Sequence, residues 1–367
     1  MMTQNKIEYL YLHVPFCKTI CHYCDFAHRV YMENVADEWL EAVAKEIRAT
    51  TIYPKLKTIY IGGGTPTSLT RKQLEQLLTL LDPYSQEIKE YTIEVNPETI
   101  DETKVQILAK HHVNRISMGF QTSNDKLLKL IGRHHSLAMV QDCMNLFRKH
   151  GIDNISLDLM YSLPTQTMSE LQKAVYDAIA LKPKHLSLYS LTIEENTVFG
   201  KKGYQHLDDD LEADMYEWIS KELPKHGFHQ YEISNYALDN YESLHNKAYW
   251  HYDDFYGISC GASGKNGYIR YDHSKSLKEY LLEPLKVNEI VLTKQDAMFE
   301  MVMMGLRLKK GMSLELFENR FGCRFDEVYG LKAKMYFEQG LLVEKEGYVT
   351  TSDSGFERLN DILVDLL

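Results

Sequence analysis

Six short runs with the apolar character of buried strands recur in the first half of the chain, and each is followed by a stretch long enough for a helix. The runs are Tyr9–Val14, Thr58–Ile61, Tyr91–Val95, Arg115–Met118, Ile155–Leu159 and Leu186–Tyr189. A parallel strand can be reached only through a crossover, so strands that alternate with helices indicate a parallel sheet. Six such units predict an α/β fold built on a partial (β/α)6 barrel of the TIM type.

The segments between these strands carry apolar residues at helical spacing, which predicts amphipathic helices that pack on the sheet. The predicted helices are Ala36–Ala49, Thr70–Leu81, Asp101–Lys110, Asp125–Ile131, Leu137–Lys149 and Ser169–Leu181. Polar or glycine-rich residues follow the first five strands. In such a barrel the chemistry collects at the carboxyl ends of the strands, so these residues are candidates for a site.

The rhythm of strands and helices stops after about residue 200. Residues 208–290 carry polar and aromatic loops. The last part contains three helical patterns, an alternating pair of strand-like runs and a final helix over 354–366, which together predict a mostly helical, winged-helix-like domain. We therefore divide the chain into a barrel domain (1–207), a connecting region (208–290) and a C-terminal domain (291–367).

The balance of charge restricts the partners of the chain. Its 367 residues include 41 basic and 52 acidic side chains, a net charge of −11. An acidic surface argues against nucleic acid as a partner, and the basic residues of the C-terminal domain are interleaved with acidic ones. No apolar run approaches the roughly 20 residues of a membrane span, and the N-terminal stretch lacks the pattern of a signal peptide. We expect a soluble, cytoplasmic protein.

Three of the six cysteines, Cys17, Cys21 and Cys24, lie within eight residues directly after the first strand. Thiolates at this spacing can hold three irons of a cubane iron–sulfur cluster and leave the fourth iron open to a small molecule with amino and carboxylate groups. A zinc site completed by His22 or His28 is the alternative, although structural zinc sites more often use two separate pairs of cysteines.

This Cx3CxxC pattern, with Tyr23 before its last cysteine, resembles the radical S-adenosylmethionine (radical SAM) superfamily over about residues 7–200. The segment Gly62–Thr67 (GGGTPT) resembles the glycine-rich segment of that superfamily. The resemblance implies a 4Fe-4S cluster on Cys17, Cys21 and Cys24. It also implies SAM as a cofactor, held by the matching residues Tyr11, Gly63, Gly64, Thr65, Glu94, Gln121, Arg133 and Asp158. Carboxylates could hold ribose hydroxyls, and Arg133 could hold the SAM carboxylate.

Within this superfamily, the strings HVPFC, YCDF, EVNPE, SMGFQ and DLMYSLP resemble the HemN-like group, and the resemblance extends over essentially the whole chain. The coproporphyrinogen III dehydrogenases of this group carry a further cysteine two residues after the motif and a longer N-terminal extension. Here Phe26 occupies that position, and only sixteen residues precede Cys17. The segment His245–Trp250 (HNKAYW) instead looks like the HNxxYW motif of the HemW heme chaperones, and Gly257–Ala262 also resembles that branch.

This second resemblance implies that the chain binds heme and delivers it to client hemoproteins, some of them at the membrane, where the chain would be peripheral on the inner face. His245 is the candidate axial ligand and His251 the runner-up, while a hydrogen-bonded structural role is the alternative for His245. The Met298–Met304 stretch is predicted to be core, with contact to heme as the alternative. A homodimer also follows from the resemblance.

Two other functions stay open. The chain could be the decarboxylating dehydrogenase, or act on another tetrapyrrole by radical SAM chemistry, because its SAM-site residues match the family. It could also be a redox sensor that couples an exposed cluster to a winged-helix output. We expect a chaperone rather than a coproporphyrinogen dehydrogenase.

Overall fold

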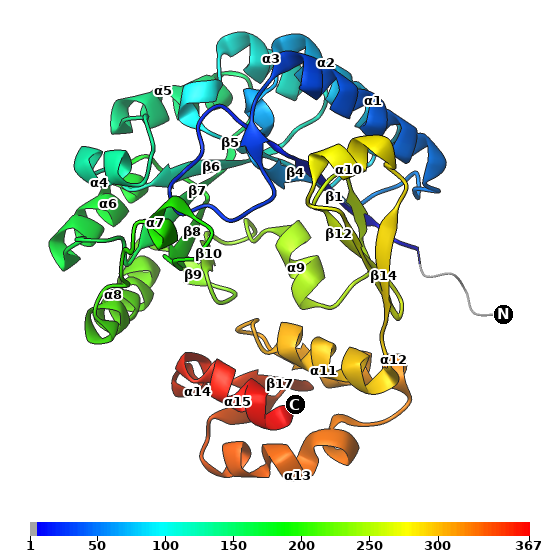
Figure 1. Ribbon diagram of the computed structural model, residues 1–367. Coiled ribbons are helices and arrows are strands. Elements are labelled where there is room, and N and C mark those ends of the chain that lie inside the picture. Colours follow the sequence, from blue (N-terminus) through cyan, green and yellow to red (C-terminus); the bar gives the residue numbers. More distant parts are fainter. Residues whose placement is uncertain (1–5) are drawn as a thin grey trace.

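The computed structural model describes residues 6–367 (Figure 1). Residues 1–5, the start of the stretch for which the sequence predicts no signal peptide, lie outside it. The main sheet contains β1 (Tyr9–Val14), β4 (Thr58–Gly63), β5 (Glu90–Val95), β6 (Arg115–Gln121), β7 (Asn154–Tyr161), β8 (His185–Ser190), β9 (His229–Gln230), β10 (Asn235–Ala237) and β11 (Tyr256–Ile258). Their order is β11-β1-β4-β5-β6-β7-β8-β10-β9. All pairs from β11 to β8 are parallel, and β10 pairs antiparallel with β8 and β9.

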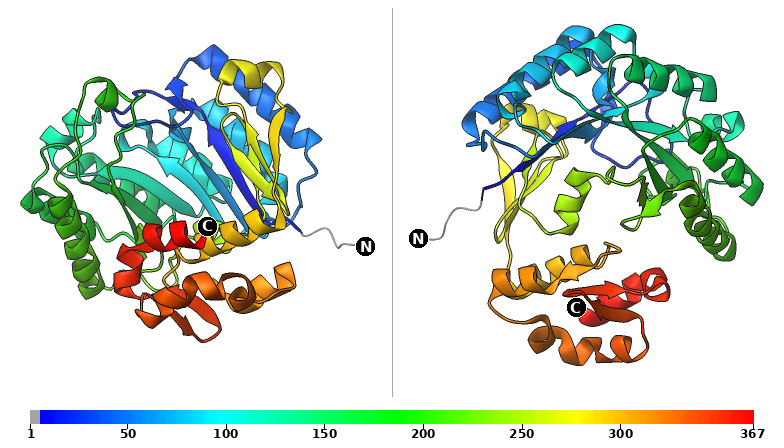
Figure 2. Two further views of the ribbon diagram at one scale, coloured as in Figure 1. Left: turned by 60° about the horizontal axis from the view of Figure 1, so that its bottom comes forward. Right: turned by 180° about the vertical axis from the view of Figure 1, so that it is seen from behind.

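Helices cover the outer face of this curved sheet (Figures 1 and 2). They are α1 (Glu33–Ala49), α2 (Arg71–Leu81), α3 (Glu102–Lys110), α4 (Asp125–Leu130), α5 (Leu137–Lys149), α6 (Met168–Ala180), α7 (Val198–Lys201) and α8 (Asp209–Glu222). The starts of α2 and α6 are fixed by capping boxes, in which Thr70 pairs with Gln73 and Thr167 with Glu170. The six predicted strands and the predicted partial barrel are confirmed.

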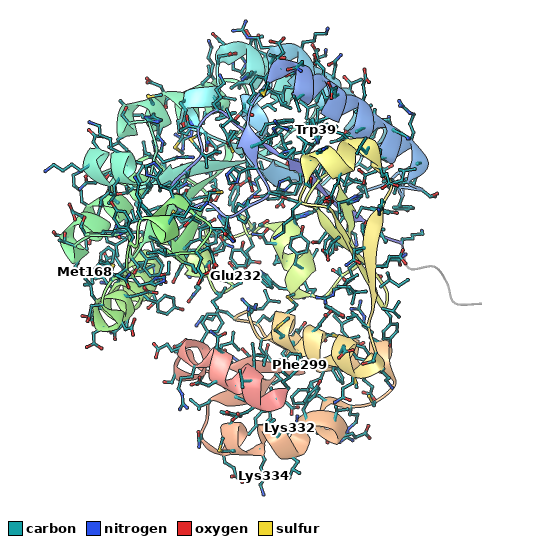
Figure 3. All side chains as sticks on the ribbon, viewed as in Figure 1. Trp39, Met168, Glu232, Phe299, Lys332 and Lys334 are labelled. Atoms are coloured by element: carbon teal, nitrogen blue, oxygen red, sulfur yellow. The ribbon has the colours of Figure 1, made fainter. Side chains whose placement is uncertain are left out.

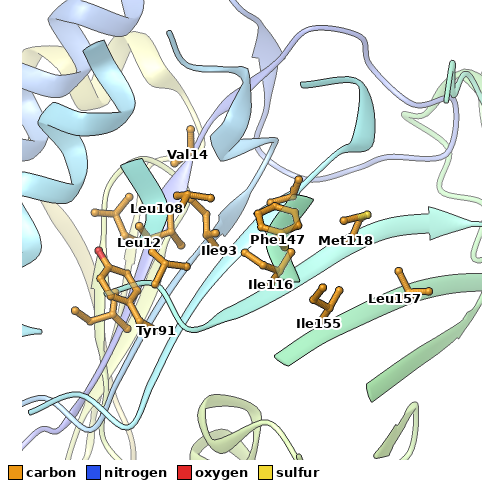
Figure 4. Packing of buried hydrophobic residues seen from close by; sticks show 14 of the residues in the cluster. Leu12, Val14, Tyr91, Ile93, Leu108, Ile116, Met118, Phe147, Ile155 and Leu157 are labelled. Carbon is orange, nitrogen blue, oxygen red and sulfur yellow. The ribbon is translucent and has the colours of Figure 1, made fainter. Parts of the chain in front are cut away.

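Alternation along the strands divides the sheet into an apolar and a polar face. In β7, Ile155 and Leu157 are fully buried beneath the helices, together with Phe147 of α5 (Figure 4). Successive side chains of a strand point to opposite faces, so Ser156 and Asp158 face the inside of the barrel. The same alternation in the neighbouring strands lines the interior with polar groups. The helices therefore cover one face of the sheet, and the other face is available for a binding site.

Residues 208–290 contain more regular structure than the predicted loops. The strands β9, β10 and β11 extend the main sheet at both edges, so the sheet has nine strands rather than six. A second, antiparallel sheet contains β12 (Ser263–Asn266), β13 (Ile269–His273) and β14 (Val287–Val291), and two helices lie nearby, α9 (Leu244–Trp250) and α10 (Leu277–Leu282). Strands of two or three residues are too short to produce a periodic pattern, which is why the sequence did not predict them.

Helix α1 joins segments that are far apart in the sequence. Its Trp39 is fully buried, packs edge-on against Phe16 with 5.5 Å between ring centroids, and donates a hydrogen bond from Nε1 to Ser259 Oγ at 2.8 Å (Figure 3). Ser259 follows β11, which pairs with β1. The first helix thereby holds the last strand of the main sheet in place.

The C-terminal module, residues 294–366, has its own apolar core. It consists of α11 (Lys294–Gly305), β15 (Met312–Ser313), α12 (Leu314–Phe321), α13 (Phe325–Glu338), β16 (Leu342–Lys345), β17 (Tyr348–Thr351), α14 (Asp353–Glu357) and α15 (Leu359–Leu366). The predicted hairpin is present, but the single helix predicted over 354–366 is wrong. Arg358, with φ −107° and ψ 21°, leaves the helical region and separates α14 from α15.

The module lies below the barrel (Figures 1 and 3) and touches it at the end of α9, where Arg307 lies over the Trp250 ring, and at the loop after β9. Glu232 of the barrel pairs with Leu308 in an isolated antiparallel bridge, and the Lys309 amide donates to the Tyr231 carbonyl at 3.0 Å. Phe299 of α11 packs against the module core. Among the helices of residues 6–367, none combines the length and the apolar character that a bilayer crossing requires.

Candidate functional site

The cysteine motif lies on the loop between β1 and α1, at the carboxyl end of the barrel strands (Figure 1, dark blue). Two short strands, β2 (Phe16–Cys17) and β3 (Arg29–Val30), pair at the base of this loop. Cys17 is buried, and Cys21 and Cys24 are half-buried. Thr65 Oγ1 donates to Cys17 Sγ at 3.6 Å, and Arg133 Nη1 donates to Cys21 Sγ at 3.7 Å. The sulfur atoms of the loop thus contact Thr65, just after β4, and Arg133, in the segment between α4 and α5.

The donor set fits an iron–sulfur cluster. Burial raises the pKa of the Cys17 thiol to about 11 and that of Cys24 to about 12, so both sulfurs lose a proton only when a metal binds. Residues 6–367 contain no group of three His, Cys, Asp or Glu side chains arranged around one metal ion. A zinc site requires such convergence, whereas a cubane takes a separate iron for each thiolate. Of the two candidate fourth zinc ligands, His22 is 2.7 Å from the Leu130 carbonyl through Nδ1, and His28 Nδ1 is 3.6 Å from Cys24 Sγ.

The glycine-rich segment passes the cysteine loop too closely for side chains. Gly63 has φ +109°, a backbone conformation that only glycine adopts readily, and a Cβ there would lie 2.6 Å from the His13 ring. A Cβ on Gly64 would lie 2.7 Å from the Phe16 carbonyl oxygen and 3.0 Å from Cys17 Sγ. Glycine at these positions therefore lets β4 end directly beside the metal-binding loop.

Two carboxylates face the inside of the barrel, Glu94 near the end of β5 and Asp158 within β7. Tyr60 Oη donates to Glu94 Oε1 at 2.9 Å, and the Gly63 amide donates to Glu94 Oε2 at 3.1 Å. Ser117 Oγ lies 2.9 Å from Asp158 Oδ2 and 3.1 Å from Oδ1. Burial raises the pKa of Glu94 to about 7 and also raises the pKa of Asp158. A carboxylate has about four lone-pair sites, so Glu94, which has two donors here, can also accept hydrogen bonds from ligand hydroxyls.

Arg133 lies beneath the cysteine loop and is buried. Its Nη2 donates to Asn96 Oδ1 and to the Gly119 carbonyl, each at 2.8 Å, while Nε has no hydrogen-bond partner. Gln121, the last residue of β6, has φ +59° and is nearly buried at the same strand end. A guanidinium that is fixed here and not fully paired fits the carboxylate of a bound amino acid.

The structure thus brings the predicted SAM-site residues together at one end of the barrel. It also places three residues there that the sequence did not single out: Tyr60, His13 and Ser117. Tyr11 Oη lies 2.9 Å from His13 Nδ1. The signal that could have found these residues is the two-residue alternation, which puts each of them on the same face as a predicted ligand.

His245 is not placed as a heme ligand. Its side chain is fully buried, Nδ1 lies 2.6 Å from Thr58 Oγ1, and Nε2 lies 2.8 Å from Tyr249 Oη. The ring also packs on Tyr60, at 5.2 Å between centroids, and burial lowers its pKa to about 3. Neither nitrogen is open to an iron, so the geometry favours the structural role for His245 over the predicted direct ligation.

Helix α9, which carries the HNxxYW motif, packs against the amino-terminal ends of strands β4 and β5. The amides of Leu244 and His245 donate to the two oxygens of Glu90 at 2.8 and 3.0 Å, and Ser243 caps the helix. The negative carboxylate stabilises the helix N-terminus. His245 therefore anchors the helix, and the anchored helix turns Tyr249 and Trp250 toward a cavity.

This cavity, of about 700 Å³, lies between the barrel, the end of the cysteine loop and the C-terminal module. We call it the inter-domain cavity. Its aromatic lining comes from Tyr11, Phe26, Tyr249, Trp250, Tyr252 and Phe255, and the module contributes Glu300 and Met304 of α11. Tyr11 also borders Glu94, so the cavity adjoins the strand-end carboxylates.

Charged groups of both signs also line the inter-domain cavity: the basic Lys265, Arg270 and Lys275, and the acidic Asp25, Asp253, Asp272 and Glu300. Arg270 and Lys275 are exposed, and Arg270 Nη1 is 3.1 Å from Glu300. Within the wall, Trp250 Nε1 is buried without a hydrogen-bond partner. A lining of aromatic rings with basic side chains fits a large planar ligand that carries carboxylates.

The barrel and the cysteine loop define the class of protein. A family model described as Radical SAM superfamily matches residues 11–177, and one described as HemN C-terminal domain matches residues 292–357. The structure superimposes with a TM-score of 0.86 on a solved structure titled coproporphyrinogen III oxidase (HemN) from Escherichia coli, a radical SAM enzyme. That match covers 98% of this chain and 90% of the other at 22% identity, which establishes a shared fold.

Closer relatives identify the branch. The chain is 40% identical to the heme chaperone HemW of Lactococcus lactis, over 99% of this chain and 98% of the relative. It is 38% identical to the heme chaperone HemW of Bacillus subtilis, over 94% and 95%. The chain therefore belongs to the HemW family within the radical SAM superfamily. Membership of that superfamily implies a 4Fe-4S cluster and SAM, which together supply one-electron cleavage of SAM when bound.

Proposed function

We propose that this chain is a heme chaperone that carries a 4Fe-4S cluster and SAM, binds heme and delivers it to client hemoproteins without oxidising coproporphyrinogen. The names of its relatives support heme as the cargo. The observation that carries the proposal is the inter-domain cavity. Its volume of about 700 Å³, its aromatic lining and the basic side chains of Lys265, Arg270 and Lys275 suit a porphyrin with its propionates.

For the cluster, we propose Cys17, Cys21 and Cys24 as ligands, supported by their place on one loop and by the hydrogen bonds that reach two of the sulfurs. For SAM, we propose the strand-end residues: Tyr11, Gly63, Gly64, Thr65, Glu94, Gln121, Arg133 and Asp158. These residues would bind and orient SAM beside the cysteine loop, with the carboxylates on hydroxyl groups and Arg133 on the carboxylate.

The first test asks whether heme occupies the inter-domain cavity. Ser263 of β12 is exposed and lines the cavity, whereas Asn266 lies on the same strand outside it. Heme titrated into the cluster-reconstituted protein should bind once per chain. Ser263→Trp fills part of the cavity and should weaken binding at least about tenfold, a loss of about 1.4 kcal/mol. The matched variant Asn266→Trp should bind heme as the wild type does. Equal affinity of all three proteins would place heme elsewhere.

The second candidate function is the oxidative decarboxylation of coproporphyrinogen III. It is favoured by the polar residues of the predicted SAM site. A protein that only carries heme would not obviously need Glu94, Asp158 and Arg133 in these positions. Against it, Phe26 replaces the further cysteine of the dehydrogenases and instead lines the inter-domain cavity with 65% of its surface exposed. Incubation with SAM, reductant and coproporphyrinogen III should yield no protoporphyrinogen IX. Catalytic turnover would support the enzyme instead.

We also propose a cytoplasmic chain that meets its clients at the inner face of the membrane as a peripheral protein, and that forms a homodimer. Support for both comes from family resemblance. Light scattering of the reconstituted protein tests the dimer, and co-sedimentation with client-free and client-containing vesicles tests where transfer takes place.

A further inference from the structure

The residue that binds the heme iron can be sought among the side chains that line the inter-domain cavity. This step rests on the proposed function. Proteins ligate heme iron through histidine, cysteine, methionine or tyrosine. The part of the chain that the structure describes contributes no cysteine to the cavity wall, and one histidine, His13, whose Nε2 is 2.7 Å from the Ala27 carbonyl and whose Nδ1 is 2.9 Å from Tyr11 Oη. Both nitrogens of this ring are already engaged.

The other histidines of the motif region do not reach the cavity. His245 is buried beneath α9 with both nitrogens hydrogen bonded. His251 follows α9 and is not among the residues that line the cavity. An imidazole ligand would therefore require α9 to leave the barrel, which would expose Glu90 and the amides that it holds.

The phenols of the cavity wall are also engaged. Tyr11 Oη is paired with His13, Tyr249 Oη lies 2.8 Å from His245 Nε2, and Tyr252 Oη donates to Glu300 Oε2 at 2.7 Å. Ionising any of them would be costly, because burial raises the pKa of Tyr249 and of Tyr252 well above that of a free phenol. A tyrosinate ligand is thereby disfavoured.

Met304 is the remaining candidate. It lies on α11 of the C-terminal module, is partly buried, and lines the cavity together with the aromatic residues that the rest of the chain supplies. Met304 also packs against the module core, as Met303 does, while Met298 and Met301 are buried within that core. Among the methionines of residues 6–367, Met304 is the one in the cavity lining. A thioether needs no deprotonation and has no competing hydrogen bond to break, and its soft sulfur prefers ferrous over ferric iron.

We propose that the thioether sulfur of Met304 ligates the iron of heme bound in the inter-domain cavity. The barrel then supplies the aromatic wall for the macrocycle, and the C-terminal module supplies the bond to the metal. A single neutral ligand leaves the other face of the iron to exchangeable groups, which suits a protein that must pass its heme to a client.

The test uses cluster-reconstituted protein, titrated with ferric and with dithionite-reduced heme. In the wild type we expect tighter binding of ferrous heme and the near-infrared sulfur-to-iron charge-transfer signal of a thioether ligand in the ferric complex. Met304→Leu keeps the volume of the side chain and should abolish that signal and weaken ferrous heme binding at least about tenfold. Met303→Leu, which changes a methionine packed against the module core, should do neither.

A second variant keeps the inference testable if Met304→Leu is poorly folded. Met304→His should bind heme with the spectrum of an imidazole complex, because a ligand at this position reaches the iron. Identical spectra and affinities in wild type and Met304→Leu, or no imidazole signature in Met304→His, would overturn the assignment while leaving heme binding intact. Failure of the wild type to bind heme at all would instead overturn the proposed function.

Discussion

Replacing Glu94 by glutamine should stabilise the protein without SAM while weakening its binding of SAM. The Glu94 carboxyl is buried at the end of β5, where it accepts hydrogen bonds from Tyr60 Oη and the Gly63 amide. Glutamine can keep both contacts: its carbonyl accepts from the amide, and its NH2 group donates to the phenol oxygen. The substitution thus removes a charge from a poorly solvated place with little change of shape.

The size of the effect follows from the pKa. Burial raises the pKa of Glu94 from 4.5 to about 7. The folded state therefore binds more protons than the unfolded state between these pH values, and the wild type loses stability as the pH rises through them. At about 1.36 kcal/mol for each pH unit, the full loss is about 3 kcal/mol above pH 7. Because the carboxyl is partly accessible from the site, water relieves some of this cost, and we expect about 1–3 kcal/mol.

The assay is urea unfolding of the wild type and Glu94→Gln at pH 4.5, 6 and 8, followed by tryptophan fluorescence. The variant should match the wild type at the lowest pH and exceed its stability at the highest. Glu75→Gln is the control, because Glu75 is exposed and the hydrogen bond from Lys110 lowers its pKa, so it should show no gain at pH 8. In parallel, the Kd for SAM should rise about tenfold to a hundredfold, the value of a hydrogen bond to a charged group.

Two results would refute this reasoning. If Glu94→Gln is no more stable than the wild type at pH 8, the carboxyl is not destabilised by burial. If its gain in stability is the same at pH 4.5 and at pH 8, the gain does not come from the charge of Glu94.

Three further predictions concern the carboxyl ends of the barrel strands and helix α9, which packs on the opposite ends of β4 and β5. Gly64→Ala should reduce cluster incorporation, measured as iron and sulfide per chain, because the new Cβ meets the backbone of the cysteine loop. The control Gly330→Ala, whose Cβ would meet Asp326 Cβ at an ordinary 3.5 Å, should not. Ser117→Ala should raise the Kd for SAM about threefold to tenfold by calorimetry, since Asp158 loses a donor worth about 0.5–1.5 kcal/mol. His245→Ala should lower the free energy of unfolding by about 2–4 kcal/mol, because the substitution leaves a void in the core and removes hydrogen bonds. The His245→Ala protein should still bind heme.

Much of the site could be predicted from the sequence because its signals are local. The three cysteines lie on one loop, and the glycines and Glu94 follow strands whose alternation is visible in the residue pattern. Parallel strands bring their carboxyl ends to one edge, so the residues that follow them must meet. The positions of Glu94 and Asp158 followed from that rule without any knowledge of distances.

The role of His245 could not be predicted from the local sequence. A histidine beside tyrosine and tryptophan has the composition of a heme ligand, and nothing in the motif reveals which way its ring points. Only the packing of α9 against β4 and β5, through Thr58 and Glu90, decides that both nitrogens face protein. The two-residue and three-residue strands β9 and β11 were missed for the same reason, since their partners lie far away in the sequence.

The sequence by itself determined the parallel barrel, the metal-binding loop and the family, because periodicity and motif spacing are properties of short segments. The tertiary structure alone decided how α9 is anchored, that an inter-domain cavity exists, and that Met304 rather than His245 faces it. These features depend on contacts between residues far apart in the sequence, such as Thr58 and His245, which are 187 positions apart. Such contacts are set by the packing of whole elements, which no local pattern of side chains encodes.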